Sequence, residues 1–539
     1  MRLIETQSKQ KLRGGFYTPE AIANFILKWA INGDANYDIL EPSVGDGVFL
    51  KQLKVNEYKY KSITAVEIDE KEAKKAEQII LKNTSVLNMD FHTFCNFTKE
   101  KYDLIVGNPP YIRYQYFNRH QQNEAEKIFK KVKIKYSKLT NAWVSFVIGA
   151  SILLKEKGKI GFVLPAEILQ VSYAKPLREF ISTFFNKISI VSFKKLVFPE
   201  IQQEVVLLLC EKNTTGSHLI EHVELKDING LLDMDVTLLK SPAKRIDFKS
   251  NKWTFYFLDQ KEIDFLEKIS RENSIPMISD YTDVEVGITT GANSFFTVPA
   301  TTVKEFGLEN YARPLVGRSV QVNSPRFTKD DWEKNVNSEA RAFLLAFPKL
   351  NELKNNEKAL EYLFLGEREN IHKGYKCGIR DEWQIVPSLW IPDAFFIRRN
   401  NHFPKLIINE ANAYSTDTMH RLKLKTSVSA PALAASFFNS LSFAYSEISG
   451  RSYGGGVLEL MPGEVKKIRI PYREQNAALI EEIDIMMRKK YSIFTILDHT
   501  NNLILKKGYG FAESDIKIAD NIWRKLSSRR LNRGKKTSY

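Results

Sequence analysis

The first half of the chain alternates short apolar runs with segments whose apolar residues recur at helical spacing. The apolar runs at 37–41, 62–68 and 103–106 predict buried strands, and a further strand is predicted to end at Asn88. Strands that alternate with helical segments are typical of an open α/β sheet. The pattern therefore predicts that the first half of the chain folds as an α/β domain.

Helices are predicted before and after these strands. The first has Thr18 and Pro19 as N-cap and first-turn residues, is apolar on one face and runs to about Trp29. A second, almost wholly apolar helix is predicted over residues 141–154. Phe146 on this helix is either a core residue or part of the wall around a bound ring.

Three more strands are predicted at residues 159–164, 187–193 and 204–210. Phe198 lies between the last two strands and is fixed by the proline that follows it. An aromatic residue in this position is either a core residue or an exposed platform on which a base can stack.

The pattern changes from about residue 213. A turn cluster at 213–217 and a linker-like segment at 241–245 precede a region that is rich in aromatic and basic residues. We therefore predict a first domain over residues 1–245 and a second over residues 246–539. Short strands, turns and helices are mixed in the second, which predicts a mixed α+β domain of unassigned topology.

The amino-acid composition indicates what class of binding partner to expect. The chain has 539 residues, 43% of them hydrophobic, and a net charge of +15, which favours a polyanionic partner. Beyond Asp520 there are seven basic residues and no acidic one, which predicts a solvated tail or one that attracts DNA. The three cysteines suit neither a disulfide framework nor a zinc site, which favours a reducing cytoplasm. The longest apolar run, 142–154, is too short to predict a membrane span.

The ends of the predicted strands carry residues that can bind a nucleoside. Glu41 ends the first strand and can accept from an ammonium or hydroxyl group, while Gly45 and Gly47 let the backbone approach a ligand closely. Glu67 ends the second strand, where an acidic residue is placed to bind both hydroxyls of a ribose. A carboxylate at a strand end is, taken alone, more often a helix cap or a solvated loop residue.

Asp90 and Phe91 follow the third strand. The carboxylate can accept from an adenine amino group and the ring can cover the base. The G-x-G-x-x-G fingerprint and a Walker lysine are missing, and Glu41 and Asp46 would repel a pyrophosphate. Since ligands gather at the carboxyl ends of strands in open α/β sheets, these residues together predict a nucleoside site.

The fourth strand leads into the loop Asn108-Pro109-Pro110-Tyr111. Proline has no N–H group, so this loop presents backbone carbonyls and the Asn108 side-chain oxygen as acceptors, with the Tyr111 ring beside them. Such acceptors suit a planar amino group. A tight turn after a strand is the alternative interpretation of the same residues.

The order of these motifs resembles the gamma-class DNA adenine-N6 methyltransferases of bacterial type II restriction–modification systems, the TaqI type. The segments that carry the resemblance are Gly15-Phe-Tyr-Thr-Pro19, Glu41-Pro-Ser-Val-Gly-Asp-Gly47, Glu67-Ile-Asp69, Asp90-Phe91, Asn108-Pro-Pro-Tyr111 and Val197-Phe-Pro199. Three C-terminal segments, at 286–296, 311–315 and 414–420, resemble the recognition domains of that family less specifically. Ser43-Val44 departs from the small residues that the family often has there.

The resemblance implies a class I S-adenosylmethionine-dependent methyltransferase domain with a Rossmann-like seven-stranded sheet, followed by a target-recognition domain. S-adenosyl-L-methionine would be the cofactor and double-stranded DNA the substrate, with a cognate restriction endonuclease as functional partner and a monomer as the expected state. Catalysis would use Asn108, Pro109, Pro110 and Tyr111, and Tyr111 and Phe198 would stack on a flipped adenine. The cofactor-binding residues would be Tyr17, Thr18, Glu41, Gly45, Gly47, Glu67, Ile68, Asp90, Phe91, Asn108 and Phe146.

Three other functions are alternatives to this one. A protein glutamine-N5 methyltransferase uses the same loop but leaves the long basic second domain unexplained. A fused restriction endonuclease is disfavoured because the methyltransferase motifs begin at residue 14 and the best acidic-x-Lys candidate, 224–226, has no nearby upstream aspartate. A non-catalytic DNA-binding module does not explain the intact loop at 108–111.

Overall fold

The computed structural model describes residues 17–31, 33, 36–137, 140–198, 203–212, 219–234, 244, 252–453 and 455–533. They form two compact units. The described residues up to Ile263, with 453, 455 and 532–533, make unit 1, and residues 264–452 and 456–531 make unit 2. The predicted turn at 213–217, and all of the predicted linker at 241–245 except Lys244, lie outside the described residues.

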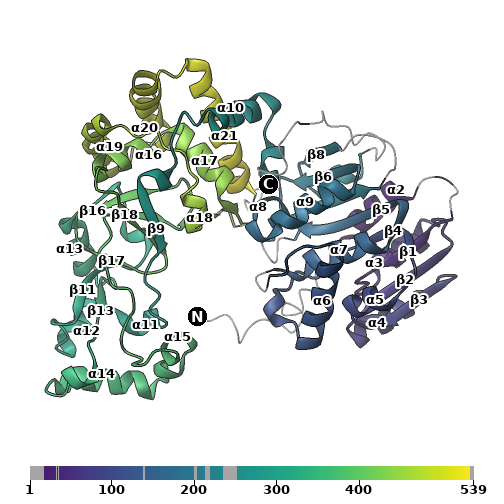
Figure 1. Cartoon of the computed structure of the whole chain (residues 1–539), viewed down its shortest axis with the longest axis horizontal. Helices are drawn as coiled ribbons and strands as arrows, with labels where there is room; N and C mark the ends of the chain where they lie inside the picture. Colours follow the sequence, from purple (N-terminus) through teal and green to yellow (C-terminus); the bar gives the residue numbers. More distant parts are fainter. Residues whose placement is uncertain are drawn as a thin grey trace. The chain divides into compact units, whose positions relative to one another are not determined.

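Unit 1 is built on one twisted sheet whose strand order is β3-β2-β1-β4-β5-β7-β6-β8 (Figure 1). β7 runs antiparallel to both neighbours, β5 and β6, and the other neighbouring strands are parallel. The strands are β1 (Asp38–Glu41), β2 (Ser62–Glu67), β3 (Thr84–Asn88), β4 (Tyr102–Gly107), β5 (Leu154–Pro165), β6 (Lys187–Phe193), β7 (Val205–Glu211) and β8 (Leu219–Leu225). Seven of them were predicted, with bounds that shift by a few residues.

The prediction of seven strands is wrong, because β8 adds an eighth strand beside β6. The sequence of β8 does not predict a strand, because polar residues occupy positions at which an alternating pattern would have apolar ones. These polar residues find partners on β6: Ser189 Oγ donates to Glu221 Oε2 at 3.4 Å, and the Ser192 hydroxyl lies 2.8 Å from His222 Nε2. Because these partners lie on β6, the pairing could not be predicted from the sequence of β8 alone.

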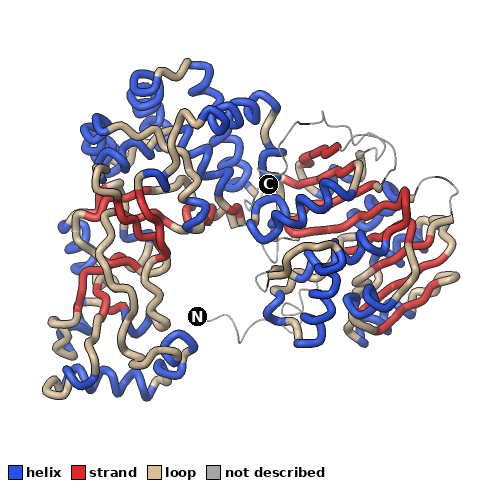
Figure 2. The backbone as a smooth tube through the Cα atoms, viewed as in Figure 1, coloured by secondary structure: helices blue, strands red, loops and turns tan. Residues whose placement is uncertain are grey.

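Helices cover both faces of this sheet (Figures 1 and 2). One face packs on α2 (Glu20–Ala30), α3 (Val48–Val55) and α4 (Glu70–Glu77), and the other on α5 (Phe91–Phe97), α7 (Ala142–Leu153), α8 (Glu167–Gln170) and α9 (Lys175–Phe184). Alternate residues of β4 enter the two cores: Leu104 and Val106 face the first, and Ile105 faces the second. Burial on both faces explains why the central strands of the sheet are continuous apolar runs.

Two local details of unit 1 differ from expectation. Thr18 is not an N-cap: α2 starts at Glu20, its N-cap residue is Pro19, and the Pro19 carbonyl accepts from the N–H groups of Ile22 and Ala23. Residues 252–263, assigned to the second domain from the sequence, belong to unit 1, where Trp253 is buried in the core. The helix α6 (Arg119–Lys131) packs on α5 and α7.

Unit 2 mixes helices and small sheets, as predicted. Its sheets have the orders β10-β13-β11-β17, β12-β16-β14-β18-β9 and β15-β20-β19. The strands are β9 (Thr282–Val286), β10 (Thr297–Val298), β11 (Ala312–Val316), β12 (Arg326–Phe327), β13 (Phe343–Leu345), β14 (Ala394–Ile397), β15 (Arg399–Asn400), β16 (Leu406–Asn409), β17 (Tyr414–Ser415), β18 (Met419–Leu424), β19 (Arg451–Ser452) and β20 (Leu458–Glu459).

The helices of unit 2 lie before, between and after these strands. They are α10 (Gln260–Glu272), which begins in unit 1, α11 (Asn293–Phe296), α12 (Ala300–Glu305), α13 (Lys329–Asn337), α14 (Glu357–Arg368), α15 (Tyr375–Gly378), α16 (Ala430–Phe437), α17 (Ser440–Ser449), α18 (Pro462–Val465), α19 (Leu479–Arg488), α20 (Ile493–Thr500) and α21 (Glu513–Asn532). Among the described residues, no helix has the length and apolar character needed to cross a bilayer.

The basic segment beyond Asp520 is helical as far as Asn532, which corrects the prediction of a solvated tail over that range. Arg530 on α21 is buried, and its Nη2 lies 2.6 Å from Oε1 of Glu447, which is also buried. A buried arginine of this kind is held by its carboxylate partner. The charge count of the segment therefore overstates the positive charge that it presents to a partner.

Candidate cofactor site and active site

The carboxyl ends of β1 to β4 border a cleft of about 840 Å³ in unit 1. This is the position at which open α/β sheets bind ligands. Most of the site residues predicted from the sequence meet here. Those that line the cleft are Tyr17, Thr18, Glu41, Gly45, Glu67, Ile68, Asp90, Phe91, Asn108, Pro110 and Phe146.

Four predicted site residues are not part of this lining: Gly47, Pro109, Tyr111 and Phe198. The Tyr111 hydroxyl donates to the Val163 carbonyl at 3.2 Å, and Phe198 is buried in the core between the sheet and α2. Gly47 has a φ of +79°, and a Cβ there would lie 2.4 Å from Ile79 Cδ1. A glycine at position 47 therefore allows the turn to pack closely against the end of α4. The predicted roles of all four residues stay predictions.

Glu67 at the end of β2 fixes the glycine turn that follows β1. Its Oε2 accepts the N–H of Gly45 at 2.9 Å, and its Oε1 accepts the N–H of Asp69 at 2.9 Å. A carboxylate has about four acceptor positions, so roughly one or two remain for a ligand. Burial raises the pKa of Glu67, although the backbone N–H groups of Asp69, Gly45 and Ile68 oppose that shift. The side chain thus joins two strand ends and keeps acceptor capacity in the cleft.

Glu41 is the most deeply buried carboxylate of the cleft, with 2% of its surface exposed. Its Oε2 is buried and has no hydrogen-bond partner among the described residues. Burial, together with the nearby charges of Asp46 and Glu67, holds the pKa of Glu41 well above its usual range. A buried acceptor of this kind favours a ligand that brings a hydrogen-bond donor or a positive charge.

Asp90 caps α5 and faces the cleft. Its Oδ2 accepts the Thr93 N–H at 2.9 Å and the Thr93 hydroxyl at 3.2 Å, and its Oδ1 lies 3.2 Å from His92 Nδ1. Burial opposes the ionisation of Asp90, but the contacts with His92 and Thr93 outweigh it and lower the pKa of the carboxyl. Capping and ligand binding are therefore compatible roles for this residue.

Two phenylalanines form an aromatic wall of the cleft. The rings of Phe91 and Phe146 stack with centroids 4.7 Å apart and planes at 29°. Both side chains also belong to the core between the sheet and α7. The two interpretations of Phe146 that the sequence left open, core residue and ring contact, thus hold together, because the core reaches the cleft at this point.

The loop after β4 enters the cleft with Asn108 and Pro110. The Ser43 hydroxyl of the glycine turn donates to the Asn108 backbone carbonyl at 3.2 Å, which ties the two loops together. Ser43 was noted in the sequence only as a departure from the family pattern. Its contact explains how a serine is accommodated there.

Sequence reasoning missed several residues of the lining. His92 stands two residues after a predicted ligand, and Tyr116 and Phe117 follow the Asn108–Tyr111 loop, so proximity to the motifs was the available signal. Other missed lining residues are Val48, Phe49, Lys71, Glu72, Lys75, Met89, Ile112 and Gln121. Carboxylates outnumber lysines in the cleft, which suits a ligand with positive charge and disfavours a pyrophosphate.

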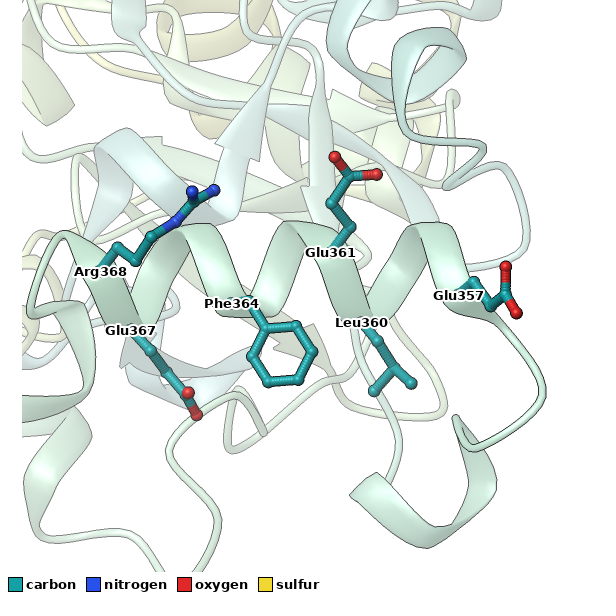
Figure 3. A pocket seen from close by; sticks show the side chains of 6 residues that line it. All are labelled: Glu357, Leu360, Glu361, Phe364, Glu367 and Arg368. Carbon is teal, nitrogen blue, oxygen red and sulfur yellow. The ribbon is translucent and has the colours of Figure 1, made fainter.

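A second hollow lies on α14 in unit 2 (Figure 3). It is lined by Glu357, Leu360, Glu361, Phe364, Glu367 and Arg368, and the side chains in the figure all come from this one helix. The lining has three carboxylates and one guanidinium, so this surface disfavours a phosphate backbone. None of the segments that carry the family resemblance lies in it.

Two family models match the chain, one for each half. Residues 25–198 match the family described as Eco57I restriction-modification methylase, and residues 250–505 match the family described as type II methyltransferase M.Eco57I, C-terminal domain. The first match contains the strands β1 to β6 and the cleft residues that follow them. The second covers most of unit 2.

Individual relatives agree with these matches. The type II methyltransferase M.AccI of Acinetobacter calcoaceticus is 26% identical over 476 residues, which cover 84% of this chain and 84% of that protein. The type II methyltransferase M.HincII of Haemophilus influenzae is 29% identical over 252 residues, 46% of this chain and 45% of that protein. Among solved structures, the DrdV–DNA complex has a similar fold over 89% of this chain and 57% of that chain, with a TM-score of 0.51 and 12% identity.

The sheet order and the cleft at the strand ends define a class I S-adenosylmethionine-dependent methyltransferase. The residues present fit that cofactor, because the cleft offers a buried acceptor on Glu41 and an excess of negative charge for a sulfonium cation. Within this class, the two family matches and M.AccI make the chain similar to the DNA methyltransferases of type II restriction–modification systems.

Proposed function

We propose that the protein transfers a methyl group to N6 of adenine within one short sequence of double-stranded DNA. The observation that carries the proposal is the position of the Asn108-Pro109-Pro110-Tyr111 loop. It follows β4, and Asn108 and Pro110 line the same cleft as the cofactor-binding candidates Glu41, Glu67 and Asp90. An amino-group acceptor and a methyl donor would thus share one cleft.

The loop suits the chemistry of an aromatic amine. The N6 lone pair of adenine is delocalised into the ring, and no side chain removes its proton at neutral pH. In the proposed mechanism, the Asn108 side-chain oxygen and the Pro109 carbonyl accept the two N–H groups and localise that lone pair. S-adenosylmethionine, when bound, supplies an electrophilic methyl group in the same cleft. Alignment and fixed acceptors then account for most of the rate enhancement, and the proton leaves to solvent.

The target adenine must leave the duplex to reach this loop. Flipping costs roughly a few kcal/mol, which stacking on Tyr111 and Phe198 would partly offset. Both residues have contacts within unit 1: the Tyr111 hydroxyl donates a hydrogen bond to the Val163 carbonyl, and the Phe198 ring is buried in the core. The proposed stacking on the buried Phe198 ring therefore requires a movement of that side chain when DNA binds.

We also propose a division of labour between the domains predicted at 1–245 and 246–539. The first would bind cofactor and the flipped base, and the second would read the flanking bases, which needs groove contacts away from the cleft. The match of residues 250–505 to the C-terminal domain of M.Eco57I supports this division. The biological role would be protection of host DNA from a cognate endonuclease, with the enzyme acting as a monomer.

Sequencing of genomic DNA from a host that expresses the gene tests the proposal. The expected result is N6-methyladenine in one short motif, absent from a host that carries the Asn108→Ala variant. Methylation of cytosine, or adenine methylation without a common motif, would contradict it. Incubation of the purified protein with labelled S-adenosylmethionine and either DNA, RNA or a glutamine-containing peptide separates DNA methylation from glutamine-N5 methylation.

A further inference from the structure

The hydrogen bonds around His92 determine how its ring is oriented. His92 is 1% exposed, lines the cofactor cleft, and its Nε2 lies 2.8 Å from the Ser145 hydroxyl on α7. That hydroxyl also contacts the Ala142 carbonyl at 2.8 Å. The Ser145 contact therefore holds the Nε2 side of the ring, and Nδ1 lies toward Asp90.

The other ring nitrogen is the donor to Asp90. His92 Nδ1 lies 3.2 Å from Asp90 Oδ1, and two unprotonated acceptors would repel each other at that distance. A carboxylate oxygen accepts, so the proton between these two atoms lies on Nδ1. Nδ1 of the buried ring is therefore the N–H group that occupies one acceptor position of Asp90.

The acceptor positions of Asp90 are nearly used up. Two are taken on Oδ2 by the N–H and hydroxyl of Thr93, and one is taken on Oδ1 by His92. A carboxylate offers about four such positions, so roughly one remains, on the oxygen that His92 contacts. His120 on α6 also borders this arrangement, because its Nε2 lies 3.2 Å from the Thr93 hydroxyl.

Aromatic packing fixes the ring itself. The imidazole makes edge contacts with Phe146 at 5.1 Å and Phe117 at 5.4 Å between ring centroids, with interplanar angles of 84° and 62°. Both phenylalanines line the same cleft. The orientation of the ring is therefore set from three sides before any ligand enters.

We propose that His92 is a positioning residue for the cofactor, which directs the one remaining acceptor position of Asp90 toward the amino group of the cofactor adenine. The proposal rests on the cofactor site proposed above. It assigns to His92 a contribution to base selectivity: adenine brings an amino donor to Asp90, whereas hypoxanthine brings a carbonyl oxygen that the carboxylate repels.

Two matched substitutions separate the ring nitrogens. In His92→Gln, the amide nitrogen replaces Nε2 and keeps the Ser145 contact but removes the donor to Asp90. In His92→Asn, the amide nitrogen replaces Nδ1 and keeps the donor to Asp90. Calorimetry measures the affinity of the wild type and of both variants for S-adenosylhomocysteine and for its inosine counterpart, and thermal melting without ligand reports the folding of each protein.

The expected result is that His92→Gln weakens S-adenosylhomocysteine binding by about 10-fold but changes binding of the inosine counterpart by less than about 3-fold. His92→Asn keeps most of the preference for the adenosine compound. Equal losses for the two ligands in His92→Gln, or loss of the preference in both variants, would show a merely structural role and overturn the proposal. A wild type that binds neither ligand would instead refute the cofactor site.

A measurement on the unmutated protein covers the case in which the variants do not fold. Nuclear magnetic resonance of protein labelled with ¹⁵N-histidine reports the protonation of each ring nitrogen among the eight histidines. A buried histidine that carries a proton on Nδ1 and correlates with the Phe146 ring protons is expected. An unprotonated Nδ1 at that position would overturn the proposal.

Discussion

The replacement Glu67→Gln tests the role of the carboxylate that joins the first two strand ends. Glutamine keeps one acceptor oxygen and replaces the other by an NH₂ group. That group would face the backbone N–H of either Gly45 or Asp69, each of which lies 2.9 Å from a Glu67 oxygen in the native protein. The variant therefore loses one backbone hydrogen bond, one acceptor position for a ribose hydroxyl, and the negative charge.

The size of the effect follows from the loss of a charge-assisted hydrogen bond. Such a bond contributes about 1.5–3 kcal/mol, and each 1.4 kcal/mol corresponds to a factor of about 10 in the dissociation constant. We therefore expect cofactor affinity to fall by about 10- to 100-fold. Asp69→Asn is the matched control, because Asp69 also borders the cleft but caps α4 through the N–H groups of Lys71 and Glu72.

The assay is calorimetry with S-adenosylhomocysteine and its 2′-deoxy analogue. If Glu67 accepts from the ribose, removal of the hydroxyl should weaken binding to the wild type but have little effect on Glu67→Gln. The Asp69→Asn control should bind both ligands within about 3-fold of the wild type. Wild-type affinity in Glu67→Gln, or strictly additive losses, would refute the assignment and leave Glu67 as a structural link between strand ends.

Three further predictions concern catalysis and stability. Asn108→Ala should lower the rate of DNA methylation in single-turnover kinetics by about 100-fold or more. The dissociation constant of the cofactor, measured by calorimetry, should stay nearly unchanged. An unchanged methylation rate would exclude the proposed mechanism. Gly47→Ala should lower the free energy of unfolding in urea by about 1–3 kcal/mol, because its Cβ would meet Ile79. Gly45→Ala should lower it by about 1 kcal/mol, because the space around Gly45 is open and only its φ of +53° causes strain. Equal losses in the two variants would contradict this account. Lys155 lies 2.7 Å from Asp38 and 2.9 Å from Asp103, and its hydrogen bond is the main cause that lowers the pKa of Asp38 from 3.8 to about 2. A lowered carboxyl pKa stabilises the folded state above pH 4, and this stabilisation is lost as the pH falls toward 2. Lys155→Met should therefore lower the free energy of unfolding by about 1 kcal/mol at pH 7 and reduce its decrease between pH 4 and 2. If the variant loses stability in acid as the wild type does, this ion pair is excluded as the cause.

Much of unit 1 follows from local sequence. Buried strands of an α/β sheet are continuous apolar runs, so β1, β4 and β6 were predicted to within about a residue at each end. Because the carboxyl ends of parallel strands meet at one edge, residues at these ends such as Glu41, Glu67 and Asp90 were expected in one site, and they line one cleft. Local pattern and the rules of parallel sheets were sufficient for these features.

Other features depend on partners that are distant in the chain. β8 is a strand because Ser189 and Ser192 of β6 satisfy its Glu221 and His222, and Arg530 is buried because Glu447 pairs with it. No local pattern reports such pairs, since a polar residue looks solvent-exposed until its partner is known. The sequence therefore placed an exposed basic tail where the structure has a packed helix.

The residues of the cleft also combine features that follow from local sequence with features that depend on distant contacts. The sequence by itself determined which carboxylates stand at the strand ends, because strand ends are local features. The tertiary structure alone decided how their acceptor positions are used: Glu67 holds the Gly45 turn, and His92 joins Asp90 to Ser145, which lies 53 residues further along the chain. The physical reason is that hydrogen-bond capacity belongs to a residue, whereas its use depends on which groups the fold brings within about 3 Å.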